Sequence, residues 1–336
     1  MFKITNEIGI DLGTSSILVF KRGEGIVLEE PTVVALNTQT RKVLAVGEGA
    51  REMIGRTPGS IIAIRPLKDG VIADYTNTVK MLDFIINRVC GKHRFLGPRV
   101  MVCVPSACTN VEKRAFEQAV REAGGREVYT IEEPMAAAIG AGMPISLPGG
   151  NMVVDIGGGT TDIAVISMGG LVIADSLRIG GIKFDESIAR HMRAAYNMMI
   201  GERTAEEIKW KIGSAYPLQQ ELRLEVRGRD LVAGLPRTVE ISSEEIREAL
   251  SEPLRTLTER VCMVLEKTPP ELSSDIIERG MVVTGGGALL RGIDSLLESV
   301  TEIPVRVAEN ALHCVALGTG RAIESIPALR KTTAKV

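Results

Sequence analysis

The fold of this chain is decided by the stretch Ile8-Gly9-Ile10-Asp11-Leu12-Gly13-Thr14-Ser15-Ser16, because a second stretch, MVVDIGGGTTD at 152–162, repeats its pattern. In each stretch an apolar run ends in Asp and is followed by one apolar residue, by Gly and hydroxyl residues, and by a second apolar run. The pattern predicts two β-hairpins whose turns are built from Gly, Thr and Ser. Asp11 and Asp155 lie 144 positions apart (155 minus 11) in a chain of 336 residues, which predicts two similar domains.

The two turns predict a phosphate site. Tight turns of this kind expose backbone N–H groups and hydroxyls, which suit phosphate oxygens. Two such turns that face each other across a cleft would hold a polyphosphate from both sides. The carboxylates of Asp11 and Asp155 would then lie where a hydrated Mg²⁺ belongs.

Composition narrows the class of protein. The chain is 45% apolar and 24% charged, as in a soluble globular protein with sizeable cores, and its net charge of −2 gives no electrostatic case for nucleic-acid binding. The five cysteines form no CxxC pair, which favours free thiols in a reducing cytoplasm, and the three histidines argue against a histidine-built metal site. No apolar run approaches the roughly 18 residues of a membrane-spanning helix, and no signal peptide is expected before the first strand.

Strands alternate with helices along the chain, which predicts α/β layers. Capping boxes, in which a Ser or Thr and a Glu three residues later satisfy each other's backbone N–H groups, predict helices that begin after Thr109 and Ser242. Pro253 is expected to kink or split the second of these helices. Apolar spacing predicts another helix near 77–90. It also predicts one helical face made of Phe184, Ile188, Met192, Ala195 and Met199.

A third glycine cluster, VVTGGGALL at 282–290, ends another apolar run. A strand is expected to end there and a helix to begin, so that glycine lets the backbone approach a flat ligand and the helix offers N–H groups. An adenine or ribose would fit against this turn, although many strand–helix turns contain Gly-Gly for structural reasons alone. No GxxxxGK[ST] or GxGxxG motif occurs, so neither a P-loop nor a Rossmann dinucleotide site is indicated.

Glu133 stands between the two turns, in the segment IEEPMAAAIG at 131–140. The alanine run predicts a slender helix that packs closely beside the floor of the cleft. At the start of that helix, just before Pro134, the Glu side chain either caps the helix and complements its dipole or points into the cleft. In the second case Glu133 would orient the water that attacks a γ-phosphate.

Taken together, these segments resemble the MreB family of bacterial actin homologues, the rod-shape-determining proteins. The resemblance extends from residue 8 to about 326 and rests on DLGTSS, EEPMAAAIGAG, DIGGGTTDIAVIS and TGGGALLRG in this order and spacing. The phosphate and adenosine turns are shared by actins, sugar kinases and seventy-kilodalton heat-shock ATPases. The strings KDGVIADY (68–75), IGERTAE (200–206) and TPPELSSDIIERG (268–280) are typical of the MreB branch.

The resemblance implies the actin-like ATPase fold, an α/β architecture in which duplicated ribonuclease-H-like domains surround a nucleotide cleft and each carries a smaller subdomain. The Gly-rich segment 140–150 is the candidate boundary between the domains. The expected division is 1–145 plus 313–336 for domain I, with a small subdomain at about 33–65, and 146–312 for domain II, with a small subdomain at about 182–245.

The resemblance also implies a site for ATP or ADP with Mg²⁺. Glu133 and Thr160 would position the attacking water, and Asp11 and Asp155 would hold the waters around Mg²⁺. Phosphoryl transfer depends on positioning and charge compensation, which such residues supply. The nucleotide-binding set would be Gly13, Thr14, Ser15, Gly157, Gly158, Gly159, Thr160, Glu206, Glu207, Ile208, Lys209, Gly285, Gly286, Gly287, Ala288 and Leu289.

The chain departs from the family pattern in two places. The first turn has Gly-Thr-Ser-Ser at 13–16 where Gly-Thr-Ala-Asn is usual, and it keeps its capacity for hydrogen bonds. Ile182 stands where the family usually has an acidic residue, while Asp185 remains. The missing carboxylate bears on how the γ-phosphate is coupled to closure of the domains.

Two apolar residues, Phe95 and Leu96, stand among cations in KHRFLGPR at 92–99. They either tuck into the domain surface or form an exposed loop that suits an anionic bilayer. Membrane-bound members of the family use a similar apolar loop at this place. The resemblance therefore implies a cytoplasmic protein that lies peripherally on the inner face of the cell membrane.

The function implied is that of a filament-forming bacterial actin that binds ATP, assembles head to tail with itself and hydrolyses ATP slowly, so that it is a weak ATPase and mainly a cytoskeletal protein. Head-to-tail contacts are heterologous and do not close, so a filament follows. Its partners would be further copies of itself, an anionic membrane and the cell-wall elongation machinery that maintains rod shape, with no nucleic acid. Two rivals remain: a small-molecule kinase, which would need an Asp base facing an acceptor pocket, and a chaperone-type ATPase, which would need a substrate-binding domain after the ATPase unit.

Overall fold

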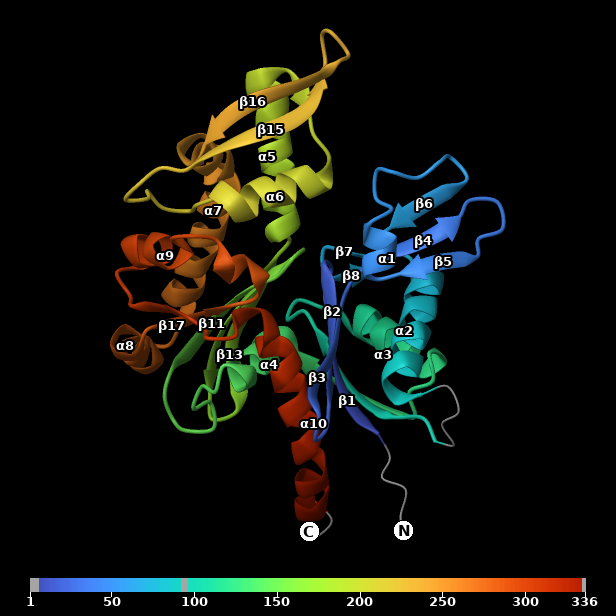
Figure 1. The fold of residues 1–336 in the computed structure, drawn as a ribbon. Helices are drawn as coiled ribbons and strands as arrows, with labels where there is room; N and C mark the ends of the chain where they lie inside the picture. The colour runs from blue at the N-terminus through green and yellow to red at the C-terminus, as the bar shows by residue number, and fades with distance from the viewer. Residues whose placement is uncertain (1–5, 92–95, 334–336) are drawn as a thin grey trace.

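A computed structural model describes residues 6–91 and 96–333, and two five-stranded sheets form its framework (Figure 1). The first sheet runs in the order β10 (Glu127–Glu132), β9 (Arg99–Val104), β1 (Glu7–Leu12), β2 (Ser16–Lys21) and β3 (Gly25–Pro31). The second runs in the order β13 (Gly170–Leu177), β12 (Thr161–Ser167), β11 (Asn151–Ile156), β17 (Met281–Thr284) and β18 (Val305–Val307).

Both predicted hairpins are confirmed, and the two sheets repeat one topology. Strand β1 pairs antiparallel with β2 and parallel with β9, while β11 pairs antiparallel with β12 and parallel with β17. Each sheet adds one more parallel strand beyond this pair, β10 or β18, and one more antiparallel strand, β3 or β13. The central strands β1 and β11 are buried along nearly their whole length, as their apolar sequences require.

Helices form layers on the faces of the sheets. On the first sheet, α2 (Tyr75–Cys90) and α3 (Asn110–Glu122) close one core, to which α2 contributes Met81, Leu82, Ile85 and Ile86. A second core lies between the two sheets and contains α4 (Glu133–Gly140) and α10 (Cys314–Thr333). The largest core joins the second sheet to α5 (Gly181–Tyr196), α6 (Glu202–Ile212), α7 (Ser243–Lys267), α8 (Pro270–Arg279) and α9 (Ile293–Thr301).

Helices α4 and α10 cross with their backbones in contact. A Cβ atom added to Gly140 would lie 1.8 Å from the carbonyl oxygen of Cys314, and one added to Gly318 would lie 1.8 Å from that of Ala136. No side chain larger than hydrogen fits at either glycine without moving a helix. The alanine run predicted to pack closely beside the cleft floor does so, since Ala136 is fully buried.

Each half carries a smaller lobe at the upper edge of Figure 1. One lobe contains β5 (Val43–Val46), β4 (Val34–Asn37) and β6 (Ile61–Ile64) with α1 (Glu48–Arg51). The other contains β14 (Met198–Met199), β15 (Arg223–Asp230) and β16 (Pro236–Ser242), next to α5 and α6. A short hairpin, β7 (Leu67–Lys68) with β8 (Val71–Ile72), leads from the first lobe to α2. The exact division of the chain into domains stays a prediction.

Local signals predicted most of the helix ends. Both capping boxes are present, with Glu112 and Glu245 as the third residues. Pro253 lies inside α7, which runs unbroken from Ser243 to Lys267, so the helix is not split and a kink there stays a prediction. Met199 lies outside α5, in β14, because the helix ends at Asn197 in a left-handed conformation. The third glycine cluster is followed by a single 3₁₀ turn, η1 (Gly286–Leu289), and the next α-helix begins only at Ile293.

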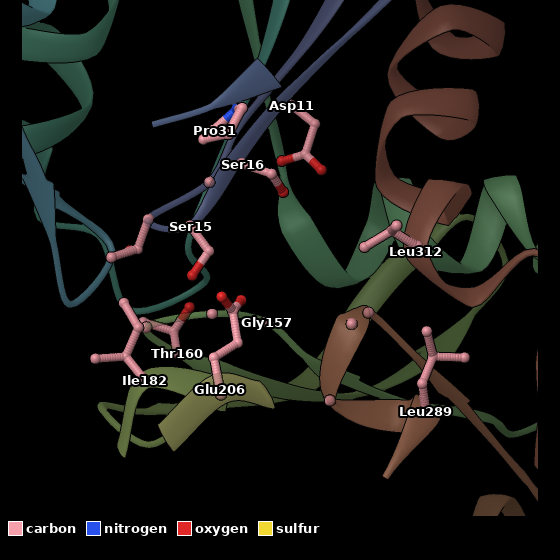
Figure 2. A pocket seen from close by; sticks show the side chains of 18 of the residues that line it. Asp11, Ser15, Ser16, Pro31, Gly157, Thr160, Ile182, Glu206, Leu289 and Leu312 are labelled. Atoms are coloured by element: carbon pink, nitrogen blue, oxygen red, sulfur yellow. The ribbon is translucent and has the colours of Figure 1, made fainter. Parts of the chain in front are cut away.

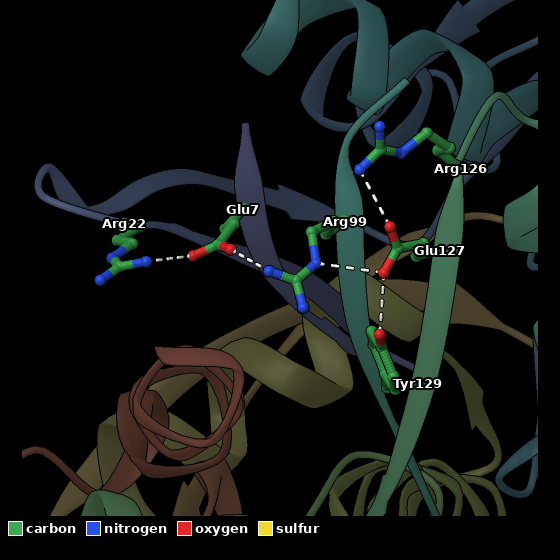
Figure 3. Close-up of polar contacts among 6 residues, drawn as sticks. All are labelled: Glu7, Arg22, Arg99, Arg126, Glu127 and Tyr129. Atoms are coloured by element: carbon green, nitrogen blue, oxygen red, sulfur yellow. Dashed lines mark hydrogen bonds and ion pairs between the residues drawn. The ribbon is translucent and has the colours of Figure 1, made fainter. Parts of the chain in front are cut away.

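An ion-pair network joins the starts of β1, β9 and β10, at the end of the first sheet opposite the hairpin turn (Figure 3). The Glu7 carboxylate pairs with Arg22 and Arg99. The Arg99 Nε lies 3.3 Å from Glu127 Oε2, to which the Tyr129 hydroxyl also donates (2.9 Å). Glu7 and Arg99 are largely buried. The network therefore helps to hold the three strands in register at the end of the sheet that lies away from the hairpin turn.

Candidate nucleotide site

A cavity of about 780 Å³ opens between the two halves at the turn ends of β1 and β11 (Figure 2). Its lining comes from both hairpin turns, from the start of α4, from α6 and from the third glycine cluster. Segments that are more than 250 positions apart in sequence, such as Asp11 and Gly286, therefore share one site. The predicted cleft is present, and it is large enough for a ligand of drug or nucleotide size.

The two turns have the same backbone and face each other. Gly13 N–H donates to Ser16 O (3.1 Å), and Gly157 N–H donates to Thr160 O (2.8 Å). A Cβ atom on Gly158 would lie 2.1 Å from Ser15 Oγ. A Cβ on Gly159 would lie 2.5 Å from Thr14 Oγ1, so glycine is required for the turns to approach this closely.

The two strand-ending aspartates are held by equivalent donors. The Cys103 thiol donates to Asp11 Oδ1 (3.3 Å), and the Thr284 hydroxyl donates to Asp155 Oδ1 (2.9 Å). Burial raises the pKa of Asp11 to about 6, while the hydrogen bond from Cys103 opposes this shift. Burial, with the nearby charges of Asp11 and Asp162, raises the pKa of Asp155 to about 8. Both carboxylates line the cavity.

Glu133 is the first residue of α4, and its side chain lines the cavity between the turns. Burial, followed by repulsion from Asp162, Asp11 and Asp155, raises the pKa of Glu133 well above its usual range. Glu133 lies in the first turn of the helix, which has no side-chain cap. Its side chain lines the cavity, as the second interpretation requires, and its role in orienting water stays a prediction. Thr160, the predicted partner of Glu133, also lines the cavity and is 7% exposed.

Asp162 is a buried carboxylate that sequence reasoning did not assign to the site. It is 1% exposed and accepts hydrogen bonds from the Ser106 N–H (2.8 Å) and the Ser106 hydroxyl (2.7 Å). Ser106 follows β9 in the first half, whereas Asp162 belongs to β12 in the second. The pair therefore ties the two halves together beside Glu133. Asp162 lies inside the quoted motif, but its burial could not be deduced from the sequence.

The third glycine cluster closes the opposite end of the cavity. Gly285 has φ of +81°, and a Cβ there would lie 2.4 Å from Ile156 O. Gly287 packs equally closely on the Ile156 side chain, at 2.2 Å. Gly286 has more room, with Leu312 at 3.4 Å, and Leu289 lines the mouth with 64% of its surface exposed. The cluster thus offers backbone and apolar surface, which suits a nucleoside.

Helix α6 contributes two charged residues, Glu206 and Lys209, to the lining of the cavity. Glu206 Oε2 lies 2.7 Å from Arg51 Nη2, and Lys209 Nζ lies 2.8 Å from Asp185 Oδ1. Burial raises the pKa of Asp185 to about 6, and the Lys209 ammonium opposes this shift. Glu206 and Lys209 both line the cavity, as the resemblance implies.

The remaining predicted residues lie elsewhere. Glu207 pairs with Lys211 (2.6 Å) outside the cavity lining, and Ile208 and Ala288 are buried in the core. Of the predicted membrane pair, Phe95 is outside the described residues, and Leu96 is 52% exposed. Cavity residues that the sequence did not suggest include Arg51, Arg65, Gly70 and Trp210.

The donor set fits a hydrated divalent cation. Asp11, Asp155 and Glu133 line one cavity. Burial raises the pKa of all three, and the charges of Asp11 and Asp162 add to the shift of Asp155 and of Glu133, which a bound cation would relieve. Within residues 6–91 and 96–333, no group of three or more His, Cys, Asp and Glu side chains could hold a metal ion directly. Mg²⁺ commonly keeps several of its waters, so these carboxylates would act on a hydrated ion.

Comparison with known proteins decides the family. The family model described as MreB/Mbl protein matches residues 5–331. The chain belongs to the MreB/Mbl family. It is 54% identical over 325 residues to the cell shape-determining protein Mbl of Bacillus cereus, covering 97% of this chain and 98% of that one. It is 55% identical over 328 residues to the cell shape-determining protein MreB of Escherichia coli, covering 96% and 94%. It is thus a cell shape-determining actin homologue.

Solved structures place the MreB/Mbl chain in the actin-like fold. MreB5 of Spiroplasma citri bound to AMPPNP matches with a TM-score of 0.92 and 38% identity over 99% of both chains, and the same protein was also solved with ADP. A MamK double helical filament matches in fold with a TM-score of 0.80 at 20% identity, over 96% of this chain and 99% of that one. In the part of the chain that the structure describes, no helix has the length and apolar character needed to cross a bilayer.

Proposed function

We propose that this member of the MreB/Mbl family is an ATP-dependent, filament-forming bacterial actin that hydrolyses ATP slowly as the filament ages. The observation that carries the proposal is the pair of facing turns, each with its own aspartate, on two sides of one cavity. A polyphosphate is the ligand that such a pair of turns suits best. The AMPPNP and ADP in the MreB5 structures support the same ligand class.

In the proposed reaction, the residues of this chain bind and orient rather than form covalent intermediates. Backbone N–H groups and hydroxyls of residues 13–15 and 157–160 hold the phosphates, and the third glycine cluster holds the nucleoside. Glu133 and Thr160 orient the attacking water towards the terminal phosphate. Asp11 and Asp155 would hold the waters of Mg²⁺, which supplies charge neutralisation on the phosphate oxygens when bound.

Assembly and location are further parts of the proposal. The family resemblance implies head-to-tail filaments on the inner face of the cell membrane, where they organise cell-wall synthesis with the elongation machinery and maintain rod shape. Head-to-tail contacts leave a free end at every step, so growth continues without closure. The net charge of −2 gives no electrostatic case for nucleic acid as a partner.

Polymerisation and phosphate release tested together decide the proposed function. Purified protein should scatter light and form filaments in electron micrographs with ATP and Mg²⁺, and should release phosphate slowly after assembly. Protein without nucleotide serves as the control. Phosphate transfer to a panel of sugars and acids, with no filaments under any condition, would favour the kinase instead.

The predicted membrane loop requires its own experiment. Changing Phe95 and Leu96 together to Ser should abolish binding to anionic vesicles and leave the ATPase intact, since each apolar side chain moved out of water contributes roughly 1.5–3 kcal/mol. One loop binds weakly, but a filament carries one loop per subunit, so attachment should depend on assembly. Loss of thermal stability and nucleotide binding in the same variant would instead assign the pair to the domain surface. A stable variant that still binds vesicles fully would contradict the loop proposal.

A further inference from the structure

Two ion pairs cross the mouth of the cavity from one small lobe to the other. Arg51, at the end of α1, places Nη2 2.7 Å from Glu206 Oε2. Arg65, just after β6, places Nη2 3.3 Å from Glu202 Oε2. Both carboxylates belong to α6, so one helix receives both cations from the opposite lobe.

Helix α6 is also tied to the second phosphate turn. Lys209 lies three residues after Glu206, and its ammonium pairs with Asp185 and donates to Gly181 O (3.0 Å). Gly181 N–H in turn donates to Gly157 O (3.0 Å), at the phosphate turn itself. Helix α6 therefore connects the contact with Arg51, made through Glu206, to the second phosphate turn, reached through Lys209.

The Arg51–Glu206 pair differs from ordinary surface pairs in exposure and position. Its side chains are 31% and 30% exposed, and both line the cavity. The Arg190–Glu252 pair, by contrast, is 57% and 69% exposed and lies outside the cavity lining. Partial burial reduces screening by solvent. Separating Arg51 from Glu206 should therefore cost more electrostatic energy than separating a fully exposed pair.

We infer that Arg51 is a positioning residue of the nucleotide site, which holds Glu206 from the opposite wall and makes nucleotide retention depend on closure of the two small lobes. This inference rests on the proposed binding of ATP in the cavity. Glu206 lines the cavity in which ATP is proposed to bind, so we expect release of the nucleotide to require the contact with Arg51 to open. Arg65 supports the same closure one turn earlier on α6, through Glu202.

The first experiment measures ATP dissociation by stopped flow with a fluorescent ATP analogue. Arg51→Ala should release the nucleotide about threefold to fivefold faster, as expected for loss of one partly screened ion pair. Arg51→Lys should fall between Arg51→Ala and wild type, and the difference from wild type should shrink at high salt. Arg260→Ala is the matched control, since Arg260 pairs with Asp175 at 3.0 Å with 37% and 26% exposure outside the cavity. It should release ATP at the wild-type rate.

A charge exchange separates positioning from general folding effects. Arg51→Glu and Glu206→Arg should each speed dissociation, and the double variant should retain ATP better than the product of the two single effects predicts. The inference would be overturned if the two single effects were additive, or if Arg51→Ala released ATP at the same rate as Arg260→Ala. Either result would leave the proposed binding of ATP intact, provided that the wild type binds ATP. A wild-type protein that binds no ATP would overturn the proposed function as well.

Discussion

The two hairpin turns have one backbone design but different surroundings. Asp11 and Asp155 occupy the same register, and each accepts a hydrogen bond from the neighbouring parallel strand. That donor is a thiol on Cys103 in the first half and a hydroxyl on Thr284 in the second. The geometry of the turns is thus duplicated, while the group that donates a hydrogen bond to each aspartate differs.

A larger difference lies one strand away. The residue paired with Asp11 is Leu18, and the residue paired with Asp155 is Asp162; both are 1% exposed. Only the second turn therefore has an additional buried carboxylate next to Glu133 among the described residues. Two equivalent turns suit a polyphosphate that is held from both sides. Attack by water on one end of that ligand is asymmetric, and it needs catalytic groups on one side only.

The largest effect is expected from Glu133, which faces both turns. Glu133→Ala should keep ATP binding but slow hydrolysis at least about tenfold, or roughly 1.4 kcal/mol in barrier, because the attacking water loses its acceptor. Phosphate release under polymerising conditions measures this. Glu132→Ala is the control, since Glu132 pairs with Lys113 (3.6 Å) and does not line the cavity. Unchanged phosphate release from Glu133→Ala would refute the assigned role.

Removing either aspartate tests whether the turns act together. Asp11→Ala and Asp155→Ala should each weaken Mg²⁺-dependent ATP binding about fivefold, because one anchor for the waters of the ion is lost. Titration calorimetry with Mg²⁺, and with a chelator in its place, separates this effect from direct contacts to the nucleotide. In the chelator the variants should bind ATP as the wild type does. Wild-type affinity in both variants would show that the two-turn site is wrong.

Exchanging the donors tests the divergence between the halves directly. Thr284→Cys gives the second turn the thiol of the first, and Cys103→Ser gives the first turn a hydroxyl. A weaker donor should lower the affinity for ATP with Mg²⁺ by about twofold to threefold in Thr284→Cys, within the range of one hydrogen bond. Cys103→Ser should shift affinity in the opposite direction. Equal shifts of the same sign would mean that packing, rather than the donor, matters at these positions.

The last expected effect is on folding stability rather than on binding, and it depends on pH. Burial raises the pKa of Asp185 to about 6 despite Lys209, with Glu206 and Arg65 also nearby, whereas the ordinary pKa of an Asp side chain is 3.8. The folded state therefore binds a proton first as pH falls, so the stability of the fold rises as pH falls through about 6 and is lost again as pH rises through that value. Between pH 7 and 5, wild type should gain about 1 kcal/mol relative to Asp185→Asn. Urea unfolding at the two pH values measures the difference, and parallel curves would contradict it.

Sequence reasoning succeeded where the signal was local. The hairpins, the capping boxes at Thr109 and Ser242, and Glu133 at the start of α4 depend on residues a few positions apart. At the third glycine cluster the strand ends at Thr284 as expected, and the helix that begins at Gly286 is a single 3₁₀ turn.

What the sequence could not supply depends on how the halves meet. Arg51 and Glu206 are 155 positions apart, and no local pattern marks either as a partner of the other. Asp162 belongs to the motif, but its contact with Ser106 exists only once the two sheets are brought together. Similarly, Ile208 follows the nucleotide motif on α6 yet packs in the core, since successive residues of a helix face different sides.

The crossing of α4 and α10 gives the molecule a mechanical property. Helix α10 packs against the first sheet and α4 against the second, and at Gly140 and Gly318 backbone touches backbone with no side chain between. Because no side chain lies between the two backbones there, a displacement of one helix is passed directly to the other. In the proposed filament, bending would strain one half of each subunit, and this crossing would pass that strain to the other half and so to the proposed nucleotide site.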